Sequence, residues 1–165
     1  IAAVALSFRR FTQLDQAEQC SFDVREGLNS ALSLLQPTIS DTIEVVRDFK
    51  PVPAIEGWPR ELNHAFMTVL QNAVQAISER GQVYAETEAS EDQVFVRIRD
   101  TGRGMTEDQA KHLFDVAWSE DGSRTRMRLG LSAAYATTQK HGGTMEVHST
   151  LGEGTTMVFR FPIAG

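Results

Sequence analysis

A short segment, Asp100-Thr-Gly-Arg-Gly-Met105, combines one carboxylate with glycines at alternate positions. Glycine lacks a Cβ atom, so its backbone can approach a ligand closely, and a carboxylate at the end of a strand can accept a hydrogen bond from an amino group. The segment could therefore line a pocket for a ligand that carries an amino group. A glycine-rich turn supported by an aspartate would show the same sequence, so both interpretations stay open at this point.

Two further positions have residue types suited to metal and phosphate chemistry. Asn72 lies among the apolar residues of a predicted helix, and an amide oxygen can be one ligand of Mg²⁺, which prefers oxygen donors and keeps several waters. Gly130 lies where another helix is predicted to begin, and free backbone N–H groups at a helix start attract phosphate. Neither residue defines a site alone. Asn72 could lie on an ordinary polar face, and a lone glycine at a helix start is weak evidence of a ligand.

The elements that must hold these residues follow from hydrophobic periodicity. A long helix is predicted from Pro59 to Gly81, because proline is tolerated as the first helical residue and apolar residues then recur at helical spacing. Strands over residues 82–89 and 93–100 alternate in polarity and predict an antiparallel hairpin. This arrangement places Asp100 at a strand end and Asn72 on a helix.

Further elements are predicted on both sides of this central part. Upstream, a strand, a helix stopped by Pro37 and a second strand are predicted over residues 22–24, 28–35 and 42–49. Downstream, a long loop is predicted over residues 101–128, with one short helix at 107–114. A helix over residues 128–141 and a hairpin of strands 144–149 and 155–162 follow it. Strands mixed with helices in this order predict an α+β two-layer sandwich, with helices on one face of a mixed, largely antiparallel sheet.

Composition excludes several classes of function. The chain has 165 residues, 41% of them hydrophobic and 23% charged, which is typical of one globular domain. Sixteen basic and 22 acidic residues give a formal net charge of −6, so no global basic field exists to hold nucleic acid. A single cysteine, Cys20, excludes an intramolecular disulfide and a cysteine-rich zinc site, and it fits a cytoplasmic location.

The first residues form a separate short unit. Ile1, Val4, Phe8 and Phe11 share one stripe of a predicted helix, which could pack on its own domain or be the end of a helical bundle. The opening apolar run is too short to span a bilayer and lacks the basic start of a signal peptide. The sequence also has no initiator methionine, so we expect a fragment of a longer protein, which could be anchored in the inner membrane through another part.

Taken in order, four segments resemble the ATP-binding catalytic domain of bacterial sensor histidine kinases, within the wider family of gyrase-type ATPases. Asn72-Ala73 on the long helix is similar to the N box, and Asp100-Thr-Gly-Arg-Gly104 matches the G1 box in its aspartate and both glycines. His112-Leu-Phe-Asp-Val116 is similar to the F box, and Leu129-Gly-Leu-Ser132 to the end of the G2 box. The likeness extends from about Cys20 to Pro162.

The resemblance implies a role for each matching residue. Asp100 would accept a hydrogen bond from the adenine amino group, and Gly102 and Gly104 would shape the pocket around the base. Asn72 would hold Mg²⁺ against the phosphates of ATP, and the backbone near Gly130 would lie beside them. Further contacts with the nucleotide are expected from Ala76, Met105, Phe114, Leu129, Leu131 and Thr155. Residues 116–128 would form a lid.

The sequence departs from the family pattern at two places that affect the expected nucleotide binding and catalysis. The resemblance implies that Thr68 and Asn72 occupy the catalytic positions of the long helix. At the position of Thr68, four residues before Asn72, the family usually has Asn, His or Glu able to help metal or proton chemistry, and a hydroxyl is a poor general base. Arg126 and Arg128 stand where the G2 box normally has glycine. Their side chains could block the approach of the backbone to phosphate, or their guanidinium groups could bind phosphate directly. A solvated lid face is the third alternative.

The resemblance implies a Bergerat-type ATP-binding domain over residues 20–165, preceded over residues 1–19 by the end of a dimerisation and phosphoacceptor hairpin. The expected reaction transfers the γ-phosphoryl group of ATP to a histidine on the rest of that hairpin, for relay to the receiver domain of a response regulator. The four histidines of this chain are expected to be surface or capping residues. The full protein would be a homodimer, and this chain a monomer or weak dimer.

Two alternatives remain at this stage. A degenerate kinase-like domain would bind nucleotide weakly or not at all and act as a signalling interaction module. An ATPase of the gyrase or chaperone kind is less well supported, because those relatives generally have a carboxylate where this chain has Thr68.

Overall fold

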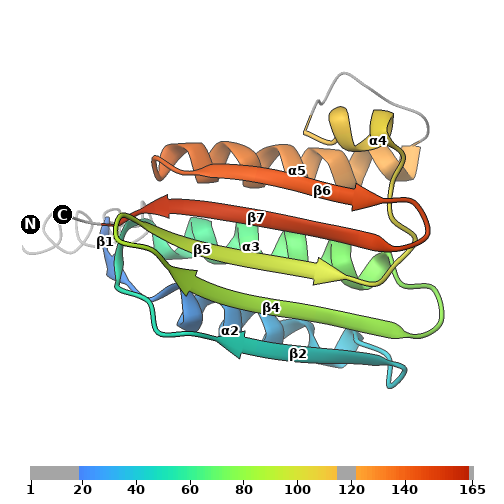
Figure 1. Ribbon diagram of the computed structural model, residues 1–165, viewed down its shortest axis with the longest axis horizontal. Helices are drawn as coiled ribbons and strands as arrows, with labels where there is room; N and C mark the ends of the chain where they lie inside the picture. Colours follow the sequence, from blue (N-terminus) through green and yellow to red (C-terminus); the bar gives the residue numbers. More distant parts are fainter. Residues whose placement is uncertain (1–18, 115–121, 164–165) are drawn as a thin grey trace, which may run out of the picture.

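The computed structural model describes residues 19–114 and 122–163, and for residues 122–129 it describes the backbone alone. The expected helix over residues 1–19 thus lies almost wholly outside the described residues. In the described part, one layer of helices lies against one face of a five-stranded sheet, as Figure 1 shows. The predicted α+β two-layer sandwich is confirmed.

The sheet is mixed, as predicted. Its strands in spatial order are β2 (Ile43–Phe49), β4 (Gly81–Ala89), β5 (Gln93–Asp100), β7 (Gly154–Pro162) and β6 (Thr144–Thr150). The pair β2 and β4 is parallel and every other pair is antiparallel. Both predicted hairpins are therefore confirmed. Asp100 is paired with Thr155, so the end of one hairpin lies beside the start of the second strand of the other.

Alternation along the strands decides which face is covered. On β5, Val94, Val96 and Ile98 are buried, whereas Arg99 is exposed on the opposite face. The buried face receives α2 (Val24–Leu35), α3 (Pro59–Gln75) and α5 (Gly122–Lys140), with α3 packed between the other two. Phe66 of α3 meets Phe159 of β7 edge to face, with 5.2 Å between ring centroids. The helix that carries Asn72 is thereby fixed to the centre of the sheet.

A small two-stranded ribbon lies apart from the main sheet. It joins β1 (Cys20–Phe22) to β3 (Ile55–Gly57), and β3 was not predicted. The predicted strand over residues 22–24 is wrong in its bounds. Asp23 caps α2 by accepting a hydrogen bond from the backbone N–H of Arg25 at 2.9 Å, so the helix already begins at Val24.

The ends of two helices differ from the predictions. The helix α3 ends at Gln75 rather than at Gly81, because the carbonyl of Ala76 accepts the N–H of Arg103 and the chain turns there. The helix α5 begins at Gly122, well before Arg128, and the short α4 covers only Glu107–Lys111. Arginine, methionine and leucine favour a helix over glycine by about 1 kcal/mol each, which accounts for a helix across a segment that was predicted as a loop.

Candidate functional site

Asp100 is the last inward-facing residue of β5 and is only 4% exposed. Its Oδ1 accepts a hydrogen bond from the backbone N–H of Gly102 at 2.8 Å, which fixes the orientation of the carboxylate. Burial raises the pKa of Asp100 above its ordinary value, while the backbone N–H groups of Gly102 and Thr155 and the charge of Arg103 oppose that rise. The site thus contains one oriented hydrogen-bond acceptor in a poorly hydrated position.

The two glycines after Asp100 are both required by close backbone contacts. A Cβ atom at Gly102 would collide with the carbonyl oxygen of Ala76 at the end of α3. Gly104 has a φ of +67°, and a Cβ atom there would collide with the carbonyl oxygen of Thr150. The loop after β5 is therefore wedged between the end of α3 and the β6–β7 turn.

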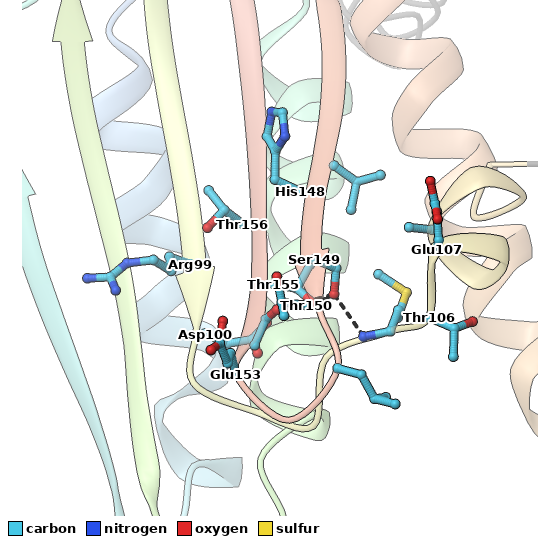
Figure 2. Close-up of a pocket in the computed structure, with 15 residues that line it drawn as sticks. Arg99, Asp100, Thr106, Glu107, His148, Ser149, Thr150, Glu153, Thr155 and Thr156 are labelled. Carbon is cyan, nitrogen blue, oxygen red and sulfur yellow. Dashed lines mark hydrogen bonds between the residues drawn. The ribbon is translucent and has the colours of Figure 1, made fainter.

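Hydrogen bonds anchor this loop to three other parts of the chain. Arg103 donates its N–H to the carbonyl of Ala76 at 3.0 Å and accepts the N–H of Gly152 at 2.7 Å. Further along, the N–H of Met105 donates to the Oγ of Ser149 on β6 at 2.8 Å, the bond that is dashed in Figure 2. The loop has a defined shape because each of these anchors comes from a different element.

A row of side chains along α3 connects this loop to α5. Thr68, Asn72 and Ala76 are spaced by four residues, so they lie on one side of the helix. At one end of the row Ala76 contacts Gly102, and at the other a Cβ atom added to Gly130 would lie 3.1 Å from the Cγ2 of Thr68. Asn72 thus lies between the loop after β5 and α5.

Asn72 and Thr68 differ in whether their side chains already have hydrogen-bond partners. The Asn72 side chain is half-buried, and among the described residues it has no hydrogen-bond partner, so its amide oxygen can accept a ligand. The hydroxyl of Thr68 instead donates to the carbonyl of His64 at 3.0 Å. No group of three or more metal-binding side chains occurs in the described part of the chain, so Mg²⁺ would depend on Asn72, phosphate oxygens and water.

Several other predicted contact residues are packed into the protein. Phe114 stacks on Tyr135 of α5, with 4.9 Å between ring centroids, and its carbonyl accepts the hydroxyl of Ser132 at 2.9 Å. Leu131 is 1% exposed and belongs to the core, and Thr155 is 5% exposed. Contacts of these three residues with a nucleotide stay predictions.

The predicted phosphate end is only partly described. The prediction that a helix starts beside Gly130 is wrong, because Gly130 lies in the interior of α5, where backbone N–H groups bond within the helix. The side chains of Arg126, Arg128 and Leu129 lie outside the described residues. So do residues 115–121, which include the first part of the expected lid.

A cavity of about 860 Å³ adjoins Asp100, and Figure 2 shows its lining. Asp100, Met105 and Thr155 contribute to its wall, together with Ser149 and outward-facing residues of the sheet. Asn72 and Gly130 do not line it. The cavity is large enough for a ligand beside Asp100, and the row along α3 lies outside its wall.

One polar residue of this region was missed in the sequence. Ser149 follows Met145 and Val147 in the alternation of β6, so a hydroxyl stands where the inner face would otherwise be apolar. That break in the alternation is the only signal the sequence offers, and it does not reveal the partner 44 residues earlier.

Comparison with known proteins agrees with this geometry. Residues 57–165 match the family described as histidine kinase-, DNA gyrase B- and HSP90-like ATPases. The chain belongs to this family. The matched range includes α3, the loop after β5 and the whole of β6 and β7.

The curated relatives of this family member include sensor histidine kinases. Sensor histidine kinase ZraS of Klebsiella oxytoca is 30% identical over 148 residues, which cover 88% of this chain and 32% of the relative. Histidine protein kinase DivJ of Caulobacter vibrioides is 32% identical over 148 residues, which cover 86% of this chain and 25% of the relative. The chain thus spans a third or less of these two proteins.

Solved structures confirm the fold. The catalytic domain of histidine kinase ThkA, in a nucleotide-free form, superposes with a TM-score of 0.78 at 20% identity and covers 88% of this chain and 97% of that chain. Full-length ShkA in complex with AMPPNP superposes with a TM-score of 0.77 at 25% identity, covering 90% of this chain and 32% of that chain. The described helices include none that is long and apolar enough to cross a membrane.

Proposed function

We propose that this chain is the ATP-binding catalytic domain of a sensor histidine kinase, which binds Mg-ATP and transfers its γ-phosphoryl group to a histidine. The observation that carries the proposal is the buried Asp100 carboxylate, held by Gly102 on a loop that rests on the end of α3. A free amide, Asn72, lies one helical turn from that contact. Base recognition and metal binding would thus be set by two residues on adjoining elements.

The roles of the residues follow from their chemistry. Asp100 accepts a hydrogen bond from the adenine amino group, and Gly102 and Gly104 let the backbone approach the base. Asn72 contributes an oxygen to Mg²⁺, which neutralises the charge of the phosphates when it is bound. Thr68 has its hydroxyl proton committed to His64, so catalysis would depend on positioning rather than on a general base in this row.

Calorimetric titration with ATP and ADP, with and without Mg²⁺, tests the proposal. The wild-type chain should bind both nucleotides with micromolar affinity, and Asn72→Ala should weaken binding of ATP mainly in the presence of Mg²⁺. Gln71→Ala is a matched control, because Gln71 is an exposed amide on the same helix. Absence of binding heat and of thermal stabilisation at millimolar nucleotide would refute the proposal.

A degenerate, nonbinding domain is the second candidate, and the early start of α5 favours it. A helix over residues 122–130 occupies the segment where the resemblance expects a glycine-rich backbone close to phosphate. Replacing both Arg126 and Arg128 by glycine separates the candidates. A gain in ATP affinity of several-fold would support degeneration, whereas a loss would identify the arginines as phosphate ligands.

The proposed reaction also requires a phosphoacceptor histidine and a response regulator, neither of which is part of the described domain. The phosphoacceptor histidine would lie on a dimerisation hairpin upstream of residue 20, in a cytoplasmic region of a homodimeric protein. A response regulator receiver domain would then accept the phosphoryl group. This chain alone should therefore not phosphorylate itself. Incubation with radiolabelled ATP tests this expectation, because label should be transferred only when the hairpin domain is added.

A further inference from the structure

Ser149 contacts three backbone or side-chain groups at the base end of the site, as Figure 2 shows in part. Its Oγ accepts the N–H of Met105 at 2.8 Å, and it lies 2.8 Å from the Oγ1 of Thr155 and 3.2 Å from the carbonyl oxygen of Gly154. Met105 and Thr155 line the same cavity as Asp100. One hydroxyl thus links the loop after β5 to the start of β7.

The hydrogen-bond capacity of a hydroxyl accounts for all three contacts. A serine hydroxyl donates one proton and accepts at two lone pairs. One lone pair accepts the N–H of Met105, the proton is donated to the carbonyl of Gly154, and the second lone pair accepts the hydroxyl proton of Thr155. In this arrangement Ser149 is fully satisfied, and no other group is needed to hold it in place.

The two halves of the loop are held in different ways. Its first half is anchored at Arg103 by backbone hydrogen bonds to Ala76 and Gly152, in which no side chain takes part. Its second half is anchored at Met105 by the side chain of Ser149. The shape of the second half therefore depends on one hydroxyl that lies outside the loop.

We propose that Ser149 is a positioning residue for the base of the nucleotide, which acts by holding the Met105 backbone and the Thr155 hydroxyl beside Asp100. This inference rests on the proposed nucleotide-binding function. It assigns Ser149 to the adenine end, so loss of its hydroxyl should weaken ATP and ADP by the same factor. The response to Mg²⁺ should not change, because Asn72 lies at the other end of the site.

The experiment compares three variants with the wild-type chain. Ser149→Ala removes the hydroxyl, Ser149→Thr keeps it on a residue that favours strands, and Thr144→Ala removes an exposed hydroxyl from the far end of the same strand. Calorimetry measures the affinities for ATP and ADP with and without Mg²⁺. Amide hydrogen exchange measures the protection of the Met105 N–H in the protein without nucleotide, and thermal unfolding gives the melting temperature.

The expected result has three parts. Ser149→Ala should weaken ATP and ADP equally, by about fivefold, which is the effect of one lost hydrogen bond. The Met105 N–H should exchange faster in this variant, because its acceptor is gone. Ser149→Thr should restore both affinity and protection, and Thr144→Ala should match the wild type in both.

Other outcomes would overturn the inference. Unchanged exchange of the Met105 N–H in Ser149→Ala would show that the hydroxyl does not hold the loop. Weakening that appears only with Mg²⁺, or that Thr144→Ala reproduces with a similar fall in melting temperature, would show that the effect is not at the base. If the wild-type chain binds no nucleotide, the proposed function fails, and hydrogen exchange alone still decides whether Ser149 positions the loop.

Discussion

The two ends of α3 are held in opposite ways. At the first end, the N–H of Trp58 donates to Nε2 of His141 at 2.9 Å, and Nδ1 of His141 donates to the carbonyl of Thr137 at 2.8 Å. Lys140 lies 4.1 Å from the centre of the Trp58 ring and pairs with Glu61 at 3.0 Å. Large side chains therefore fill this end of the helix.

At the second end of α3 the contacts are made by backbone and glycine. The carbonyl of Ala76 accepts the N–H of Arg103, and Gly102 leaves no side chain between the loop and the helix. Beside this end lie a buried carboxylate, Asp100, and an amide without a partner among the described residues, Asn72. Side-chain packing and ion pairing therefore stabilise the first end of α3, whereas the second end leaves two polar side chains available to the proposed nucleotide.

The largest effect on nucleotide affinity should come from a change at the second end of α3. Asp100→Asn keeps an oxygen that can accept the N–H of Gly102, but it replaces the oxygen proposed to accept from the adenine amino group with an amide donor. We expect ATP affinity to fall by about ten- to a hundredfold, the range for a lost hydrogen bond to a charged group, without unfolding. Calorimetry measures this, with the exposed Asp92→Asn as control. Equal affinity in the two variants would show that Asp100 does not contact the base.

A change at the first end of α3 should lower the stability of the fold and leave nucleotide binding unchanged. His141 is 7% exposed and makes hydrogen bonds from both ring nitrogens, so His141→Ala leaves a cavity and an unpaired N–H on Trp58. The free energy of unfolding should fall by about 2–4 kcal/mol, with no change in nucleotide affinity for the folded protein. Urea unfolding measures the loss. His148→Ala, at an exposed position, should lower stability little. An equal loss in both variants would show that the buried contacts of His141 do not stabilise this end of α3.

The smallest effect concerns the pH dependence of stability. Burial raises the pKa of Asp100 in the folded state, so the folded protein holds this proton more tightly than the unfolded chain does. The contribution of Asp100 to stability is therefore present at acid pH and lost as pH rises through the raised pKa. Asp100→Asn should gain stability relative to the wild type from acid to neutral pH in urea unfolding. A relative loss over that range would show that the ionised form is favoured by folding.

Local pattern was enough to predict much of the fold and the place of Asp100 in it. Alternation along residues 82–89 and 93–100 predicted the hairpin, and with it the position of Asp100 at the end of a strand. The start of α3 at Pro59 also follows from the fixed backbone angle of proline. These features depend on neighbouring residues, which a sequence shows directly.

The features that were missed depend on contacts between distant residues. The strand β3 is three residues long and exists because it pairs with β1, and α3 stops where Arg103 bonds to Ala76. His141 was expected to be a surface or capping residue. It does cap α5 at Thr137, but Trp58 and Phe161 bury its ring. No local pattern contains these partners.

The pairing of Asp100 with Thr155 also limits when the site can exist during protein synthesis. The hairpin of β4 and β5 can form as soon as its residues are made, because its strands are neighbours in the chain. The wall that Ser149 and Thr155 supply belongs to β6 and β7, which are translated after β4 and β5. A nascent chain therefore has Asp100 and Asn72 before it has a complete pocket. If nucleotide binds as proposed, it would stabilise the domain only after β6 and β7 have been made.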